Sequence, residues 1–303
     1  MKRIPKLSFT LLSLALSTAT SYAQRDTLMQ SEGDGRMYYK ITAHTDGTLL
    51  EEGFTKDGAK DGSWSTYNEN GALKTTVTYS NGQKNGMSMQ VNSSGLPDYM
   101  EFYKNGKLHG KQWQYSASGR IVTMTEYADG KKNGIYRKNF ENGQVQGEAS
   151  YVADKVNGAY KKYHENGKLA EVTNYKDDKQ DGEYKTYYKN GLVAEEGSHI
   201  SGLRDGKSLR YMENGEKEAV LTYKSGVLNG YAEHYFKDGH LKEYGNYKNG
   251  LRQGQWKEYH HAGVREFEGK YVDDKKEGEW KEYMNGILER VTLYRQGKAI
   301  KSL

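Results

Sequence analysis

Apolar and aromatic residues occur along this chain in short strand-like runs, each bounded by turn-forming residues. Gln255 to Tyr259 and Val264 to Tyr271 are two such runs, and His261-Ala262-Gly263 separates them. Short runs rich in aromatic and β-branched residues between Gly-containing turns are typical of β-strands. No window of useful length shows the 3.6-residue apolar period of a helix. The pattern predicts an all-β protein made of short strands and tight turns.

One Gly recurs at a spacing of 24 residues through ten units, and we call it the repeat Gly. The ten repeat glycines are Gly62, Gly86, Gly110, Gly134, Gly158, Gly182, Gly206, Gly230, Gly254 and Gly278. Four residues before the repeat Gly, seven units have another Gly and three have Asp154, Asp178 or Asp274. Asp is among the residues that best tolerate positive φ, so this position is predicted to need a left-handed backbone.

Most of the 27 Tyr residues keep the same register. Aromatic residues recur two and five residues after the repeat Gly, and Tyr recurs seven residues before it. Each unit therefore contains two strands and two turns. Asn-Gly pairs such as Asn70-Gly71 and Asn166-Gly167 predict hairpins, because both residues of such a turn can take positive φ. The resulting fold class is an elongated, single-sheet β-hairpin solenoid of about ten 24-residue repeats, with about 20 antiparallel strands.

The N-terminus has the features of a secretory signal peptide. Lys2, Arg3 and Lys6 precede a short apolar stretch, and cleavage is predicted between Ala23 and Gln24. The chain has no Cys to carry a lipid, and no second apolar stretch follows. We expect a secreted or periplasmic cell-envelope protein without a lipid anchor or transmembrane helix.

The repeat register divides the mature chain into segments. The predicted organisation is 1–23 signal peptide, 24–35 N-terminal extension, 36–53 degenerate first repeat or cap, 54–298 repeat solenoid and 299–303 C-terminal tail.

Charge and motifs exclude several functions. The 45 Lys and Arg against 40 Asp and Glu give a formal charge of +5, which falls to +2 once the signal peptide is removed. Such a near-neutral chain does not predict nucleic-acid binding. The sequence has no metal-binding His motif, phosphate loop, nucleophile elbow or dinucleotide fingerprint. His260-His261 and the acidic turns at Asp177-Asp178 and Asp273-Asp274 are interpreted as solvated turns. We expect no catalytic, metal or cofactor site, and a protein that is not an enzyme.

The aromatic rows are the remaining candidate for a binding surface. The candidate residues are Trp64, Tyr67, Tyr160, Tyr163, Tyr184, Tyr187, Trp256, Tyr259, Trp280 and Tyr283. An exposed ladder of these rings is suited to stacking on a glycan or to burial in an interface. The alternative is that the rings form the core, because the chain has few other large apolar side chains. The two aromatic positions, two and five residues after the repeat Gly, are an odd number of residues apart. A regular strand therefore places them on opposite faces unless a bulge intervenes.

The run from Tyr247 to Tyr259, with Gly250, Gly254 and Trp256 in register, resembles the variant form of the MORN repeat (membrane occupation and recognition nexus). The resemblance extends from about residue 36 to residue 298. It implies a β-hairpin solenoid with a binding role and no catalysis by the repeats. The first aromatic position departs from the pattern at Ser88, Gln112, Ser208 and Ala232, and the second at Val91 and Asn139.

These observations favour a non-enzymatic scaffold that binds a protein partner at the cell envelope. A surface that binds membrane lipid or a surface glycan through the aromatic ladder is one alternative. An antitoxin-like component of a toxin–antitoxin pair, a label often given to similar bacterial chains, is another. The sequence does not define the oligomeric state.

Overall fold

The computed structural model describes residues 25–43 and 45–303. The predicted signal peptide, 1–23, and the predicted cleavage site between Ala23 and Gln24 lie outside the described residues. The described residues form 28 β-strands and contain no helix, so the all-β prediction is confirmed. None of them lies in a helix with the length and apolarity needed to cross a bilayer.

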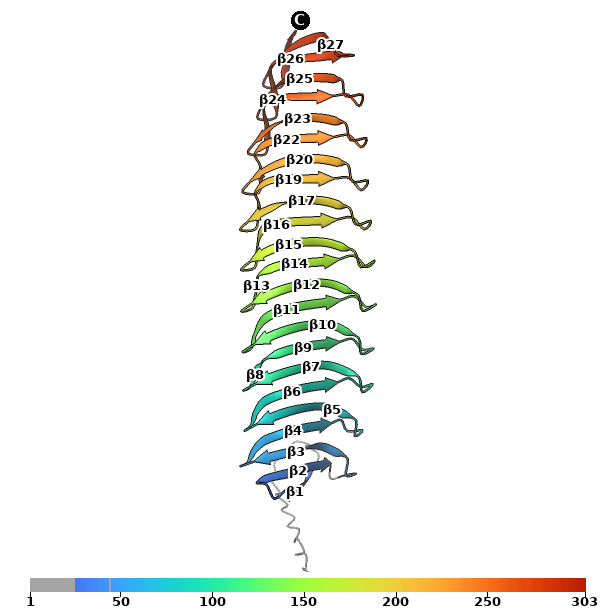
Figure 1. Ribbon diagram of the computed structural model, residues 1–303, viewed down its shortest axis with the longest axis vertical. Coiled ribbons are helices and arrows are strands. Elements are labelled where there is room, and N and C mark those ends of the chain that lie inside the picture. Colours follow the sequence, from blue (N-terminus) through green and yellow to red (C-terminus); the bar gives the residue numbers. More distant parts are fainter. Residues whose placement is uncertain (1–24, 44) are drawn as a thin grey trace, which may run out of the picture. The chain divides into compact units, whose positions relative to one another are not determined.

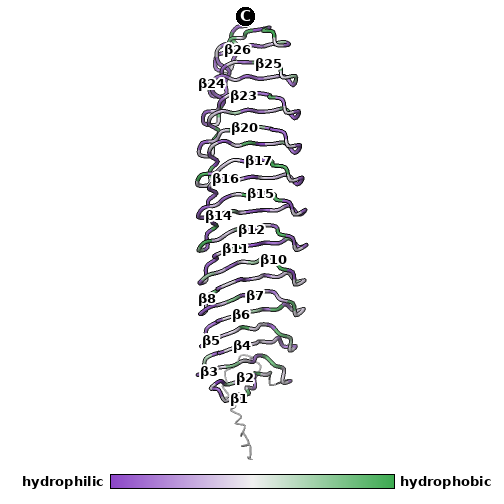
Figure 2. Tube along the Cα trace, in the orientation of Figure 1, coloured by the Kyte–Doolittle hydropathy of each residue, from purple (hydrophilic) through white to green (hydrophobic). Residues whose placement is uncertain are grey.

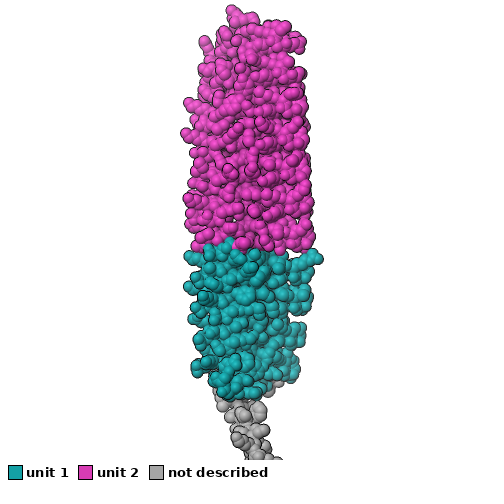
Figure 3. Space-filling view, in the orientation of Figure 1, with its two compact units in different colours: residues 1–134 teal, residues 135–303 magenta. Residues whose placement is uncertain are grey.

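The chain divides into two compact units, residues 1–134 and 135–303 (Figure 3). Within each unit, strands that follow one another in sequence pair antiparallel and form an open sheet (Figure 1). The strands of the first unit are β1 (Arg25–Ser31), β2 (Arg36–Ala43), β3 (Leu49–Lys56), β4 (Ala59–Tyr67), β5 (Leu73–Ser80), β6 (Gln83–Val91), β7 (Pro97–Lys104), β8 (Lys107–Leu108), β9 (Gly110–Tyr115) and β10 (Ile121–Ala128). The division between the units falls within β11 (Lys131–Asn139).

The second unit continues the same hairpin pattern. Its strands are β12 (Val145–Val152), β13 (Lys155–Val156), β14 (Gly158–Tyr163), β15 (Leu169–Lys176), β16 (Lys179–Tyr187), β17 (Val193–Ile200), β18 (Leu203–Arg204), β19 (Gly206–Tyr211), β20 (Lys217–Lys224), β21 (Val227–Leu228), β22 (Gly230–Tyr235), β23 (Leu241–Lys248), β24 (Leu251–Tyr259), β25 (Arg265–Val272), β26 (Lys275–Met284), β27 (Ile287–Arg295) and β28 (Lys298–Ser302).

The difference between about 20 expected strands and the 28 observed has two causes. The two-residue strands β8, β13, β18 and β21 are the first parts of longer strands that are interrupted at one residue. The other four are β1, β2, β3 and β28, which lie outside the ten repeat units. β2 and β3 form a hairpin that precedes β4 and β5 by 24 residues, and β1 pairs with β2. The hairpin geometry therefore extends beyond the ten units that carry the repeat Gly.

The repeat Gly and the residue four positions before it have a left-handed backbone in every unit. The ten repeat glycines have φ between 71° and 122°. Asp154, Asp178 and Asp274 have φ of 73°, 67° and 61°, and each of them follows a residue that also has positive φ. Two successive residues with positive φ are typical of the tight type I′ hairpin turn. The Asp178 carboxylate also accepts a hydrogen bond from the Val156 N–H at 2.7 Å, which couples consecutive repeats.

The Asn-Gly pairs form the predicted hairpins, but only the Gly of each pair has positive φ. Gly71 and Gly167 have φ of 79° and 80°, but Asn70 and Asn166 are not in the left-handed region. The Asn70 Oδ1 accepts a hydrogen bond from the Ala72 N–H at 3.0 Å. This side-chain bond to the residue two positions on is the Asx turn, and it accounts for Asn at this position.

The hydrophobic core is thin and divided into small clusters. One cluster in the second unit contains Ala219, Leu221 and Ala232, and another contains Trp256, Tyr271 and Trp280. Figure 2 shows hydrophobic residues as short, separate segments along the strands of each unit. Such a sheet is stabilised mainly by contacts between neighbouring strands.

Candidate binding surfaces

Each sheet has two faces, which we define from the strand register. Positions are counted from the repeat Gly, so that Trp256 is at +2 and Tyr259 at +5. The face that carries position +2 also carries +13, +15 and +17, and we call it the aromatic face. The opposite face carries +1, +3, +14 and +16, and we call it the alternate face.

Four of the ten predicted binding residues are buried on the aromatic face. Trp64, Tyr184, Trp256 and Trp280 have exposed fractions of 6%, 5%, 0% and 3%. Tyr160 occupies the same position and is half-buried. The buried rings act as core and leave no ring face free for a ligand.

Each of the three Trp residues at +2 lies against a Gly of the preceding strand. A Cβ added to Gly245 would lie 2.3 Å from the Trp256 ring, and one added to Gly269 would lie 2.4 Å from the Trp280 ring. Gly53 has the same relation to Trp64, at 2.3 Å. The indole therefore occupies the space that a side chain would fill in the neighbouring strand.

Cations cover the buried rings. The Arg252 guanidinium lies 4.4 Å from the Trp256 ring centre, and the Lys276 ammonium lies 4.0 Å from that of Trp280. Such contacts contribute about 0.5–2 kcal/mol, more when they are desolvated. The Arg252 guanidinium also contacts the Glu243 carboxylate at 2.9 Å. Burial, followed by the nearby charge of Glu243, raises the pKa of Glu258.

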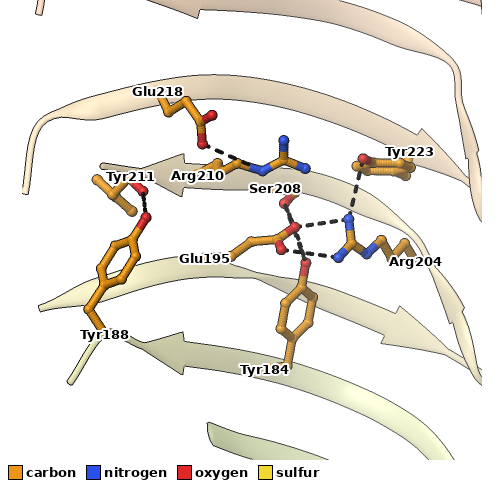
Figure 4. A network of polar contacts seen from close by, with 9 residues as sticks. All are labelled: Tyr184, Tyr188, Glu195, Arg204, Ser208, Arg210, Tyr211, Glu218 and Tyr223. Atoms are coloured by element: carbon orange, nitrogen blue, oxygen red, sulfur yellow. Dashed lines mark hydrogen bonds and ion pairs between the residues drawn. The ribbon is translucent and has the colours of Figure 1, made fainter. Parts of the chain in front are cut away.

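A related network surrounds Glu195 (Figure 4). Its carboxylate accepts hydrogen bonds from the Tyr184 hydroxyl at 2.9 Å and the Ser208 hydroxyl at 3.1 Å. The Arg204 guanidinium forms an ion pair with it at 2.9 Å and donates to the Tyr223 hydroxyl at 3.3 Å. With these donors in place, the Glu195 carboxylate acts as a structural acceptor that joins three strands.

The Tyr residues at +5 contact the alternate face. The Tyr67 hydroxyl donates to Glu52 at 2.6 Å, and the Tyr283 hydroxyl donates to Glu268 at 2.8 Å. Tyr163 and Tyr211 make the equivalent bonds to Glu148 and Glu196. The acceptor Glu lies 15 residues earlier in each case, so these hydroxyls join consecutive repeats. The hydrogen bond to Glu52 is the main cause that raises the pKa of Tyr67.

Two further predicted residues at +5 have different surroundings. The Tyr259 ring stacks on Tyr244 with 6.2 Å between ring centres. Tyr187 is half-buried, and its backbone carbonyl lies 2.9 Å from the His164 ring nitrogen. A register shift separates +4 from +5, as at Glu258/Tyr259. The residue left unpaired, Glu266, is on the partner strand β25, so side chains keep alternating along β24 and the two aromatic rows lie on opposite faces.

A row of apolar side chains crosses the alternate face of the first unit. We call it the Met/Trp strip, and it consists of Met87, Met89, Met100, Phe102, Trp113 and Met124. Met89 pairs with Met100, Met100 with Trp113, and Trp113 with Met124. These four residues therefore lie side by side across the strands β6, β7, β9 and β10. The Phe102 and Trp113 rings are 6.0 Å apart in an edge-to-face arrangement. All six side chains are half-buried.

The same two repeats are polar on their aromatic face. Ser88 and Gln112 replace the aromatic residue at +2. The Gln112 side chain donates to Glu101 at 2.7 Å, and the Tyr103 hydroxyl donates to the other Glu101 oxygen at 2.7 Å. The polarity of the two faces is therefore reversed in the repeats that begin at Gly86 and Gly110.

Reasoning from the sequence did not identify the Met/Trp strip. Its signal is present as the alternating pairs Met87-x-Met89 and Met100-x-Phe102. Trp113 is also the single Trp outside position +2. Both signals can be interpreted only after the strand register is known.

The second unit has a hollow of about 610 Å³ on its aromatic face. Tyr136, Tyr160 and Phe140 line it together with Lys138, Lys162 and the buried Gly147. Tyr160 and Tyr163 are the two predicted binding residues that contribute to this hollow. Burial, with a smaller effect of Tyr160, raises the pKa of Tyr136.

The turn residues considered as metal ligands have other partners. The Asp177 carboxylate lies 3.4 Å from the Lys155 ammonium. The His261 ring stacks on Phe236 with 3.9 Å between ring centres. Within residues 25–43 and 45–303, no group of three His, Cys, Asp or Glu side chains is placed to hold a metal ion.

Comparison with known proteins identifies the repeat. The sequence profile of the MORN repeat variant matches residues 60–81, 132–153, 156–177, 180–200 and 228–249. A search of curated proteins finds no match.

Three solved structures have local similarity to the chain. A structure of S. aureus TarM in complex with fondaparinux, α-GlcNAc-glycerol and UDP has 11% identity and a TM-score of 0.21, over 43% of this chain and 21% of that chain. The Photorhabdus luminescens Tc holotoxin pore has 12% identity and a TM-score of 0.19, over 92% of this chain and 18% of that chain. A TcdB2–TccC3 structure has 11% identity and a TM-score of 0.20, over 85% and 17%. The chain spans about a fifth of these proteins, and similarity at this level carries no argument about function.

Proposed function

Since the chain carries MORN repeat variants, we propose that it is a non-enzymatic scaffold that binds a partner protein on the Met/Trp strip. The observation that supports this proposal is the reversed polarity of two adjacent repeats. In them, long apolar side chains lie on the face where the repeats that begin at Gly134 and Gly182 have the ion pairs Arg137–Glu148 and Lys185–Glu196, each at 2.7 Å.

The chemistry of the strip favours an apolar protein surface as the occupant. None of its six residues is charged, so the contact gains its free energy from apolar burial. Full burial of a Met or Phe side chain contributes about 1.5–3 kcal/mol relative to full exposure, and these side chains are half-buried already. Several such side chains together are sufficient for a stable contact. Met is flexible and polarisable, which suits a surface that adapts to the shape of a partner.

We further propose that binding takes place outside the cytoplasm. The support is the N-terminal pattern of Lys2, Arg3 and Lys6 followed by a short apolar stretch. The partner would accordingly be a periplasmic, surface or secreted protein.

Site-specific photo-crosslinking tests the proposal. A photoreactive benzoylphenylalanine at Met100, in the full chain expressed in its host, is expected to give a discrete adduct with one partner protein. The matched control carries the same group at Glu268, which occupies the same repeat position, +14, in the second unit. The control is expected to give no such adduct.

The affinity of the identified partner then provides a second measurement. The Trp113→Ser variant is expected to weaken binding at least tenfold, because it removes the largest ring of the strip. Equal adducts from both crosslinking positions, an adduct with a second copy of this chain, or unchanged affinity of Trp113→Ser would each contradict the proposal.

A further inference from the structure

Gly147 lines the hollow on the aromatic face of the second unit and contributes no side chain to it. Gly147 is at position +13, where other repeats have Glu51, Glu171, Glu195 and Glu243. It has no positive φ, so the backbone does not require Gly here. A Cβ at Gly147 would lie 3.3 Å from the Lys161 carbonyl oxygen, which is close but does not overlap a ring.

Two Tyr rings border this space and are held by neighbouring rings. Tyr136 lies edge-to-face with Tyr151 at 6.2 Å, and Tyr160 lies edge-to-face with Tyr175 at 5.8 Å. Tyr136 and Tyr160 occupy the same position in consecutive repeats, two strands apart. At the usual strand spacing, their backbones are about 9.6 Å apart. The rings therefore border an extended site and are too far apart to enclose a single planar group.

The lining carries an excess of positive charge. Lys138, Lys162 and Lys189 contribute three ammonium groups, against the single carboxylate of Glu165. Among residues 25–43 and 45–303, Lys138 and Lys189 form no ion pair. The Lys162 ammonium contacts Glu171 at 2.8 Å, which occupies one of its three N–H donors.

We propose that this hollow binds an acidic oligosaccharide with one carboxylated sugar in each disaccharide. The C–H faces of the sugars stack on Tyr136 and Tyr160, and the sugar carboxylates accept hydrogen bonds from Lys138 and Lys162. These two Lys residues are equivalent positions of consecutive repeats, so their spacing of about 9.6 Å is close to the length of one disaccharide. The observations behind this inference are the ammonium groups of Lys138 and Lys189, which form no ion pair among the described residues, the fixed Tyr rings and the missing side chain at Gly147.

A nucleotide fits the same residues less well. The described lining has no Arg and no Gly-rich loop at a helix N-terminus, the groups that bind phosphate through several fixed donors. Lys is a point charge on a flexible stem, which suits single carboxylates.

Calorimetric titration of the full chain tests the inference. The probes are a hyaluronan hexasaccharide, a neutral chitin hexasaccharide of the same length, inorganic phosphate and UMP. The acidic hexasaccharide is expected to bind at least tenfold more tightly than each of the other three. Gly147→Glu fills the hollow with the side chain found in other repeats and is expected to weaken this binding at least tenfold.

Two further variants separate loss of the site from loss of the fold. Lys138→Gln leaves the hollow open and is expected to weaken binding about threefold at low salt, with a smaller effect at high salt. Lys224→Gln removes one exposed positive charge outside the lining and is expected to change binding less than twofold. The Trp113→Ser variant is expected to keep full binding, so that this site and the Met/Trp strip can fail independently.

The inference is overturned if the acidic hexasaccharide does not bind, or if the neutral hexasaccharide, phosphate or UMP binds as tightly. It is also overturned if Gly147→Glu, shown to be folded by its circular dichroism spectrum, binds like the unmodified chain.

Discussion

Two pairs of repeats in this protein have the same backbone pattern and opposite surface chemistry. The repeats that begin at Gly254 and Gly278 bury Trp256 and Trp280 on the aromatic face. Their alternate face carries a charged network in which the Glu268 carboxylate contacts Arg265 at 3.0 Å. The Tyr283 hydroxyl donates to the same carboxylate. Burial raises the pKa of Glu268, but the Tyr283 hydrogen bond and the neighbouring cations lower it overall.

The repeats that begin at Gly86 and Gly110 reverse this arrangement. Their aromatic face holds Gln112 and Glu101 in a hydrogen-bonded network, and their alternate face holds the Met/Trp strip. The repeat glycines keep positive φ in both pairs. The comparison indicates that the turns set the fold, while the side chains decide in each repeat which face carries the large apolar residues.

The largest expected difference between the pairs concerns position +2. Trp256→Ala is expected to lower the free energy of unfolding by about 3–5 kcal/mol, because it leaves a cavity where a fully buried indole packed. Gln112→Ala, at the same position, is expected to cost about 1 kcal/mol through the lost hydrogen bond to Glu101. Urea unfolding of the full chain, followed by hydrogen exchange to locate the loss, measures both. Similar losses of unfolding free energy for Trp256→Ala and Gln112→Ala would show that the two pairs of repeats do not differ at position +2.

The Gly that faces each Trp gives the next largest effect. Gly269→Ala is expected to cost about 1–3 kcal/mol, because its Cβ overlaps the Trp280 ring. The Ala149 and Tyr160 pair occupies the corresponding positions of another repeat, so Ala and Tyr are compatible there. The double variant Gly269→Ala/Trp280→Tyr is therefore expected to be less destabilised than the sum of its single variants. Additive losses in the same unfolding assay would argue against direct packing of the two residues.

His199 gives a smaller and pH-dependent effect. It occupies position +17, where most repeats have Tyr, and its Nδ1 is buried without a hydrogen-bond partner. Burial, followed by the charge of Arg204, lowers the pKa of His199 below its usual 6.5. The unfolded chain therefore binds more protons between the folded pKa and 6.5, and stability is lost as the pH falls through this range.

His199→Tyr is expected to raise stability by about 1 kcal/mol at pH 7.5 and to reduce the loss between pH 7 and pH 5. Some pH dependence is expected to remain, because burial also lowers the pKa of His234. The measurement is thermal unfolding across this pH range, with the exposed His240→Gln as the control variant. An unchanged pH profile for His199→Tyr would show that the buried imidazole does not contribute to it.

The repeat architecture could be predicted from the sequence because backbone positions with positive φ require Gly or a residue such as Asp, and these residues recur at a fixed spacing. A Gly at a constant spacing, with Gly or Asp four residues before it, defines the hairpins without any knowledge of packing. The Asn-Gly hairpins could be predicted as well, but the sequence did not define the turn conformation, because Asn can satisfy a turn in two ways. At Asn70 the side-chain hydrogen bond to Ala72 occurs, and positive φ does not.

The candidate surfaces could be predicted only in part. The odd spacing between positions +2 and +5 predicted that they lie on opposite faces of a regular strand. It did not indicate that Trp256 is buried or that the Tyr283 hydroxyl binds Glu268. The Met/Trp strip and the hollow at Gly147 depend on residues from neighbouring strands. Their recognition requires the register between strands, which one sequence does not contain.

The smallest effect is expected for a substitution that tests whether the alternate face of the second unit tolerates an apolar residue in place of a charged one. Lys281 occupies position +3, as Met89 and Trp113 do, and its ammonium lies 3.6 Å from Glu268. Lys281→Met is expected to change the free energy of unfolding by less than about 0.5 kcal/mol, because the Lys281 side chain is 41% exposed and Glu268 keeps Arg265 as a partner. A loss above about 2 kcal/mol would mean that the charged network holds these repeats together. A small change would mean that folding tolerates an apolar residue at +3 of this face, where the first unit has Met89 and Trp113.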